Sequence, residues 1–97
     1  MKVRWSDVAV SELEAIFLYI LEHNRSSALK VARRIIDRAD SLEEFPLTGH
    51  SVNHAEIRKL VVANYPYVIY YKIDVVADEV LIASICHTAR KQSPAED

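Results

Sequence analysis

The segment IRKLVVANYPYVIYYKIDVVADEVLIASICH, residues 57–87, decides the fold. It contains three runs rich in β-branched and aromatic residues, IRKLVV, YVIYYKI and EVLIASICH, and each run predicts a strand. The connections ANYP and DVVAD are so short that consecutive strands must pair antiparallel. The last run is apolar on both faces, which predicts an interior strand that is covered on one side and partly on the other.

The sequence before this segment has helical periodicity. Apolar residues recur at helical spacing from Asp7 to about His23, and both Ser6 and Asp7 are candidates for the N-cap. A second helix is expected to begin at a cap formed by Ser26 or Ser27. It must end near residue 44, because the proline at position 46 disfavours the α conformation at the residue before it. Two helices joined by so few residues are expected to form an antiparallel hairpin.

The remaining segments complete the architecture. MKVRW alternates polar and apolar residues, which predicts a short first strand, and PLTGHSVNHAE is expected to be the one long loop. The element order is therefore β-α-α-β-β-β, in the α+β class. We expect a helical hairpin packed on a small, mostly antiparallel sheet, with residues 1–97 forming a single domain.

Composition limits the classes of partner. The net charge is −2, whereas proteins that bind nucleic acid through phosphates usually carry a cationic excess. No apolar run approaches the roughly 20 residues that span a bilayer, and we expect a cytoplasmic protein. The single cysteine excludes an internal disulfide and a cysteine-based zinc site. His50 and His54 have no well-spaced third ligand, so neither a metal nor a cofactor is expected.

A candidate site lies at the end of the last predicted strand, in the stretch ICHTARKQ. His87 could serve as a general acid or base, and Arg90 and Lys91 follow it. Arg58 opens another predicted strand, so its guanidinium could meet Arg90 and His87 at one end of the sheet if these strands are neighbours. Alternatively, His87 could donate one hydrogen bond to a backbone carbonyl and have no further role.

Tyrosines of the middle strand form the second candidate surface. Strand alternation places Val68, Tyr70 and Lys72 on one face, and Tyr67, Ile69, Tyr71 and Ile73 on the other. Tyr67 and Tyr71 are expected in the core. Tyr70 could be a half-buried sheet residue or, beside Lys72, a contact for a partner.

The second helix has an apolar stripe that is wider than one sheet face can cover. Leu29, Val31 and Ile36 flank the inner positions of this helix. We therefore expect a helix or an extended segment of a partner protein to occupy the remaining apolar groove.

The chain resembles the RelE/ParE superfamily of bacterial toxins, which are the toxin halves of type II toxin–antitoxin systems. The resemblance runs from Val3 to Lys91 and rests on FPLTGH leading into IRKL, on the aromatic stretch YPYVIYY and on a strand that ends in H-x-x-R. It implies an antitoxin whose C-terminal segment wraps the sheet and helices of the toxin.

The resemblance implies one of two activities. RelE-like members are ribosome-dependent nucleases that cut messenger RNA, and this reading makes Arg58, Lys59, His87 and Arg90 catalytic. ParE-like members poison DNA gyrase. Tyr67 stands where the nucleases carry an arginine, and the tail after Lys91 is acidic and lacks the late tyrosine that the nucleases often have.

The resemblance to the ParE branch therefore predicts a gyrase inhibitor with no catalytic residues, held inactive by a cognate antitoxin. The RelE-like mRNA endonuclease is the alternative. A third possibility is a protein that has lost its toxicity and retains only antitoxin binding. The residues expected to bind the target or the antitoxin are Arg58, Tyr70, Lys72, His87, Arg90, Lys91, Leu29 and Ile36.

Overall fold

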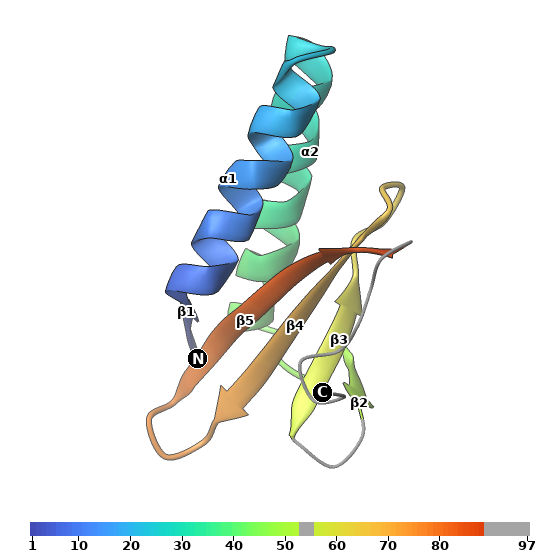
Figure 1. The fold of residues 1–97 in the computed structure, drawn as a ribbon. Helices are drawn as coiled ribbons and strands as arrows, with labels where there is room; N and C mark the ends of the chain where they lie inside the picture. Colours follow the sequence, from blue (N-terminus) through green and yellow to red (C-terminus); the bar gives the residue numbers. More distant parts are fainter. Residues whose placement is uncertain (53–55, 89–97) are drawn as a thin grey trace.

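The computed structural model describes residues 1–52 and 56–88. A helical hairpin packs on one face of a five-stranded sheet (Figure 1). The elements in chain order are β1 (Lys2–Trp5), α1 (Asp7–Leu21), α2 (Arg25–Asp40), the 3₁₀ turn η1 (Ser41–Glu43), β2 (His50–Val52), β3 (Ile57–Val61), β4 (Tyr67–Asp74) and β5 (Glu79–His87). This architecture confirms the predicted α+β class.

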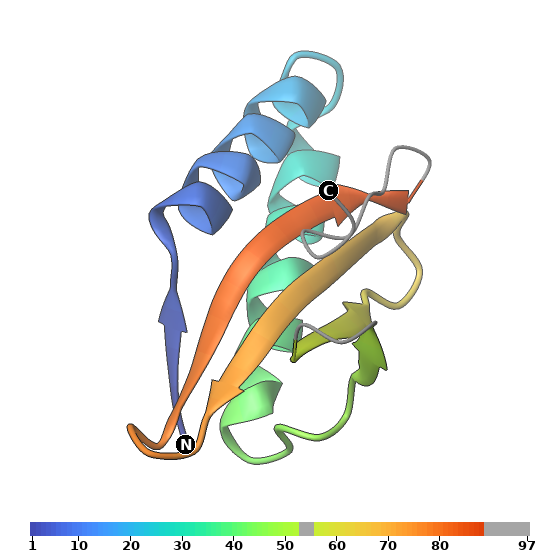
Figure 2. The same ribbon diagram turned by 60° about the horizontal axis from the view of Figure 1, so that its bottom comes forward.

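The strand order is β1-β5-β4-β3-β2, and β5 is therefore an interior strand (Figure 2). β1 is parallel to β5, and the other pairs are antiparallel. The expectation of one long loop between the helices and the sheet was incomplete, because this segment contains β2, with His50 opposite Lys59. Three residues with one apolar side chain give too little alternation to predict a strand.

The central strand β4 is buried on both faces. Tyr67, Ile69 and Tyr71 join the main core under the helices, whereas Val68 and Tyr70 pack on the opposite face. The faces predicted from strand alternation are confirmed along this strand.

A bulge in β5 changes which residues face the helices. Tyr70 lies opposite Ser84 but Tyr71 lies opposite Ile82, so Ala83 is an extra residue on β5. Ile82 and Ile85 both join the main core as a result, although strict alternation would place them on opposite faces.

Side-chain caps fix where the helices begin. The Ser6 hydroxyl accepts a hydrogen bond from the Ala9 amide and donates one to the Ala83 carbonyl, each at 3.0 Å, so one residue caps α1 and binds the bulge. α2 is capped by Asn24 and not by either predicted serine. The Asn24 side chain accepts from the amide of Ser27 at 3.0 Å, so Ser27 contributes its backbone and not its hydroxyl.

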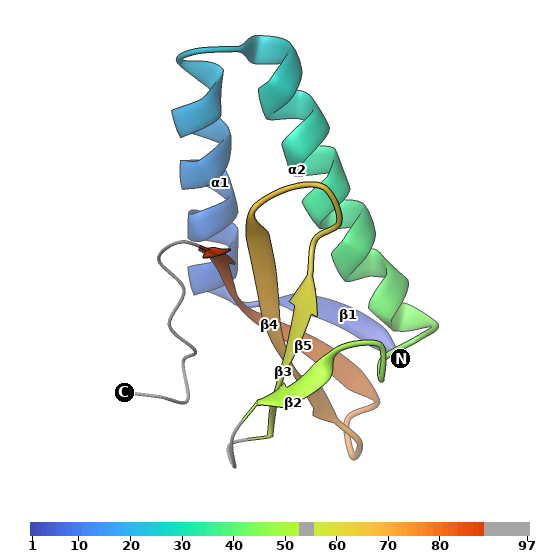
Figure 3. The same ribbon diagram turned by 90° about the vertical axis from the view of Figure 1, so that its right-hand side faces the viewer.

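The helical hairpin extends beyond the sheet. In Figures 1 and 3 the connection between α1 and α2 lies well past the ends of the strands that the helices cover. Residues 15–21 of α1 are all apolar, yet Ala9 is the only buried residue of this helix, and Leu18 and Tyr19 are exposed. None of the helices in the described part of the chain has the length and apolarity needed to cross a bilayer.

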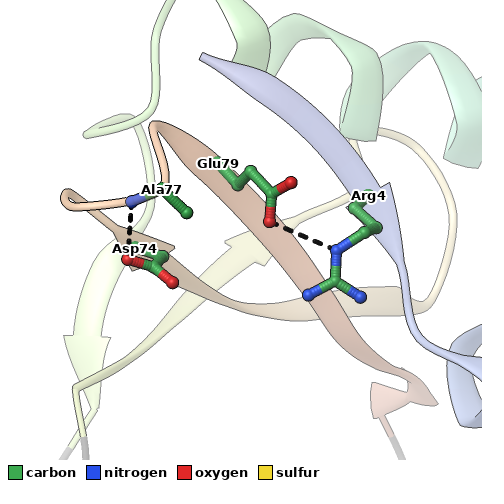
Figure 4. A network of polar contacts seen from close by, with 4 residues as sticks. All are labelled: Arg4, Asp74, Ala77 and Glu79. Carbon is green, nitrogen blue, oxygen red and sulfur yellow. Dashed lines mark hydrogen bonds and ion pairs between the residues drawn. The ribbon is translucent and has the colours of Figure 1, made fainter.

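At the opposite end of the sheet, polar contacts hold the β4–β5 turn and the edge strand β1. The Asp74 carboxylate accepts a hydrogen bond from the Ala77 amide, and the Arg4 guanidinium pairs with Glu79 at 3.2 Å across the parallel β1–β5 edge (Figure 4). The tip of this turn carries two strongly exposed apolar residues, Val75 and Val76.

Candidate functional site

Arg58 binds the chain's own backbone. It lies on the helix-facing side of β3, opposite Tyr71. Its guanidinium donates to the carbonyls of Gly49 and Leu47 at 2.6 and 3.2 Å and to the Ser51 hydroxyl at 3.3 Å. Its Nε–H is buried and makes no hydrogen bond within the described residues. The Arg58 guanidinium, which was predicted to contact a target or a substrate, therefore mainly stabilises a loop of the protein itself.

Tyr71 also forms hydrogen bonds with the backbone of this loop. Its hydroxyl donates to the Pro46 carbonyl at 2.7 Å and accepts from the Gly49 amide at 2.9 Å, and its side chain is fully buried. A Cβ atom on Gly49 would lie 2.7 Å from this hydroxyl, so the close approach requires glycine. We call residues 45–49 the tethered loop.

Lys59 lies on the other face of the sheet. It is opposite Tyr70, whereas Arg58 is opposite Tyr71. Because successive side chains of a strand point to opposite faces, Arg58 and Lys59 cannot line the same site.

His87 lies at the far end of β5. It is opposite Tyr67, and the two rings meet edge to face with their centroids 5.3 Å apart. A groove of about 640 Å³ runs beside it between α1 and β5. The groove is lined by Glu12, Ala15, Ile16, Tyr19, Tyr67, Ile85 and His87.

The condition under which Arg58 and His87 could meet at one end of the sheet is not met, because β3 and β5 are not neighbours. β4 separates the two strands, and their positions along β4 differ by four residues. With about 3.4 Å per residue and about 4.8 Å between strands, their Cα atoms lie roughly 17 Å apart. Arg90 and Lys91, which were expected to join this site, lie outside the described residues.

Tyr70 and Lys72 share a face but differ in exposure. Tyr70 is only 2% exposed and packs with Ile57 and Val68, with Val52 and Cys86 beside them. Lys72, opposite Ile57, is exposed. Of this predicted pair, Lys72 is therefore the residue that a partner could reach in the described structure.

Glu12 was not singled out from the sequence. Its carboxylate accepts hydrogen bonds from the Ser84 hydroxyl and the Ile85 amide, both at 2.9 Å. These residues lie past the end of β1, where no strand of the described residues pairs with this edge of β5. Glu12 thus accepts hydrogen bonds from donors on that edge of β5. Its place in the sequence, four residues before Ile16 in the first helix, did not indicate this role.

Of the three residues that were expected to flank the inner stripe of the second helix beside an open groove, Val31 is instead buried in the main core. Leu29 is 56% exposed and Ile36 is 38% exposed. Two adjacent grooves of about 410 and 560 Å³ lie along the contact between the helices on their outer side. We call this surface the hairpin seam; its lining residues are Leu13, Glu14, Phe17, Leu18, Leu21, Arg25, Leu29 and Ala32.

Metal ligands do not cluster in the described structure. Residues 1–52 and 56–88 contain no group of three histidine, cysteine, aspartate or glutamate side chains placed to hold an ion. His54, which was considered as a ligand together with His50, lies outside these residues.

Comparison with known proteins identifies the family. Residues 3–92 match the family model of the ParE toxin of type II toxin–antitoxin systems, parDE. The chain belongs to the ParE toxin family. Toxin RelE2 of Caulobacter vibrioides is 40% identical over 90 residues, which are 92% of this chain and 97% of the relative. The Sinorhizobium fredii protein Y4kP is 33% identical over 93 residues, covering 96% and 93% of the two chains.

Solved structures share the ParE fold. A chain of the chromosomal ParDE toxin–antitoxin system from P. aeruginosa has a TM-score of 0.79 at 20% identity, covering 90% of this chain and 95% of the other. A chain of the RelBE2 toxin–antitoxin complex from Mycobacterium tuberculosis has a TM-score of 0.65 at 18% identity, covering 89% and 95%. At these identities the likeness concerns the fold.

Proposed function

We propose that this ParE-family protein inhibits DNA gyrase by protein–protein contact and that a cognate antitoxin neutralises it. The observation that carries this proposal is the separation of Arg58, Lys59 and His87, the candidate catalytic residues that the structure describes. Arg58 and Lys59 lie on opposite faces of β3, and His87 lies at the other end of the sheet.

This separation argues against RNA cleavage by these residues. Transfer through the 2′-hydroxyl needs a base, an acid and cations around a single phosphate, all within hydrogen-bond reach. Side chains whose Cα atoms are roughly 17 Å apart do not meet this condition without a large rearrangement. Arg58 would also have to leave its backbone carbonyls.

The proposed antitoxin site is the hairpin seam. Both structural relatives described above come from toxin–antitoxin systems, one of them solved as the complex. Leu29 and Arg25 line one of the seam grooves. Ile36 and Arg33 are exposed on α2, each four residues after a groove-lining residue of the same helix. An amphipathic antitoxin segment with acidic flanking residues would cover this apolar surface and pair with the arginines.

A RelE-like, ribosome-dependent mRNA endonuclease is the second candidate. It is favoured by the name of the 40% identical relative, toxin RelE2. This activity would require Arg58, Lys59, His87 and Arg90 to act together on one phosphate when the ribosome is bound.

Two assays on toxin freed of its antitoxin test the proposal. In the first, gyrase supercoiling and trapped cleaved DNA are measured with wild type and with His87→Ala. Inhibition by both proteins supports a contact mechanism. In the second, programmed ribosomes are scored for mRNA cleavage. Cleavage that His87→Ala abolishes, together with unaffected gyrase, would overturn the proposal and establish the endonuclease.

A further inference from the structure

The tethered loop presents two large apolar side chains to solvent. Phe45 is 62% exposed and Leu47 is 70% exposed, on either side of Pro46. With the side chains of Pro46 and Thr48 they surround a shallow depression next to Glu44. Burying such side chains against a partner would be favourable, and two of them side by side on one loop form an apolar surface that a partner could cover.

The backbone of this loop is held in place along its length. The Phe45 amide donates to the Ser41 carbonyl at 3.0 Å, and the Thr48 amide and hydroxyl both donate to the Phe45 carbonyl. Tyr71 binds Pro46 and Gly49, and Arg58 binds Leu47 and Gly49, as described above. The two exposed apolar residues are therefore displayed from a backbone that is already ordered.

An ordered apolar loop is suited to protein recognition. A contact that is held in its bound conformation loses little conformational entropy on binding, and a few such residues usually dominate the affinity of an interface. The charges beside the loop indicate the partner's character. Asp40, Glu43 and Glu44 are exposed within six residues of Phe45. They outnumber the two cations that bind carbonyls of this segment, the Arg58 guanidinium and the amino group of Met1, so a complementary surface would carry cations.

The position of the loop separates it from the hairpin seam. The loop leads from the sheet-side end of α2 into β2, whereas the seam grooves follow the helices toward the α1–α2 connection at the other end of the molecule (Figure 3). A partner segment lying along the seam would not by itself cover Phe45 and Leu47.

We propose that the toxin binds its target protein through the tethered loop. Phe45 and Leu47 enter an apolar pocket of the target that is rimmed by lysine or arginine side chains. This inference rests on the proposed function, in which the toxin acts by protein–protein contact.

The test compares two pairs of exposed apolar residues. The variant is Phe45→Ser with Leu47→Ser, and the matched control is Val75→Ser with Val76→Ser on the β4–β5 turn, where the exposed fractions are 77% and 99%. Each protein is expressed without antitoxin to score growth arrest, and each is purified to measure its melting temperature and its affinity for the cognate antitoxin.

The loop variant is expected to lose growth arrest and to inhibit gyrase about 100-fold less well, because two central contacts are removed. Its melting temperature and its antitoxin affinity should match those of wild type, and the control pair should remain toxic. Charge reversal by Glu43→Lys with Glu44→Lys should also weaken toxicity, since it opposes the cationic rim.

Several outcomes would overturn the inference. These are undiminished arrest by the loop variant, loss of antitoxin affinity in place of toxicity, or equal loss of toxicity in the control pair. If the double variant is less stable, Leu47→Gln alone, at the more exposed position, provides the test. A wild-type protein that causes no arrest would instead refute the proposed function, and this inference with it.

Discussion

At the scale of single residues, Arg58 and Tyr71 anchor the tethered loop to the sheet. They lie opposite each other on β3 and β4, and both direct their polar groups at backbone atoms of residues 46–49. A forked guanidinium can bind two carbonyls and a hydroxyl at once, which a lysine ammonium on a flexible stem does poorly. The loop conformation therefore depends on the shape of the arginine as well as on its charge.

Arg58→Ala should destabilise the protein by roughly 2–3 kcal/mol, because it leaves the Leu47 and Gly49 carbonyls without their charged donor. Lys59→Ala, one residue along and on the opposite face, should change the free energy of unfolding by no more than about 0.5 kcal/mol. Urea denaturation measures both values. Equal stability of the Arg58→Ala variant and wild type would show that the loop does not depend on this side chain.

Gly49→Ala should cost roughly 1–3 kcal/mol, because the added methyl group would lie 2.7 Å from the Tyr71 hydroxyl and 2.8 Å from the Lys59 carbonyl. The double variant Gly49→Ala with Tyr71→Phe should recover part of this loss, since phenylalanine lacks the hydroxyl. Additive losses in chemical denaturation would argue that the clash is with the Lys59 carbonyl or with the ring carbon Cε1, which lies 2.8 Å away and is retained in phenylalanine, and not with the hydroxyl.

The sequence predicted the environment of Tyr71 but not its bonds. Period-two alternation was sufficient to place Tyr67 and Tyr71 in the core. The partners of the Tyr71 hydroxyl lie 22 and 25 residues earlier in the chain, and no local pattern specifies contacts over that separation. The exposure of Phe45 and Leu47 was missed for the same reason.

At the scale of helices and strands, boundaries depend on caps and bulges that several residues could supply. The stretch HNRSS offers three capping side chains in five positions, and only the geometry of the turn selects Asn24. In β5, the small residues Ala83 and Ser84 interrupt a bulky apolar run, which is a weak signal of the bulge. That bulge places His87 on the helix-facing side, beside Tyr67, and away from Lys59.

The cap of α2 gives a prediction that distinguishes the two assignments. Asn24→Ala should lower stability by about 0.5–2 kcal/mol, because the Ser27 amide loses its acceptor. Ser26→Ala should have almost no effect, since Ser26 is exposed and lies inside the helix. Thermal unfolding followed by circular dichroism measures both, and a larger loss in Ser26→Ala would favour the cap predicted from the sequence.

At the scale of the whole molecule, the hairpin seam and the tethered loop form two separate apolar surfaces. One runs along the hairpin toward the α1–α2 connection, and the other lies beside β2. From the width of the apolar stripe on α2 the sequence predicted an open surface there, but it did not predict that Val31 would be buried or that α1 would contribute Phe17 and Leu18 to the seam.

Substitution in the seam should weaken antitoxin binding without loss of stability. Leu18→Ser with Leu29→Ser removes two exposed groove-lining residues, and the dissociation constant of the antitoxin should rise at least about tenfold. Val8→Ser serves as the control, because Val8 is 59% exposed on the same helix but lines neither seam groove. Calorimetric titration measures the three affinities, and an unchanged value for the double variant would place the antitoxin elsewhere.

The parallel pairing of β1 with β5 has a consequence for how the protein is made. Lys2 pairs with Glu79, so β1 has no hydrogen-bonding partner in the sheet until β5 has been synthesised. At about 5–20 residues per second, translation leaves β1 without its partner for roughly 4–15 s. A nascent chain that stops before Glu79 lacks the strand that joins β1 to β4, so the sheet cannot close. A folded toxin can therefore exist only after the residues of β5 have been synthesised.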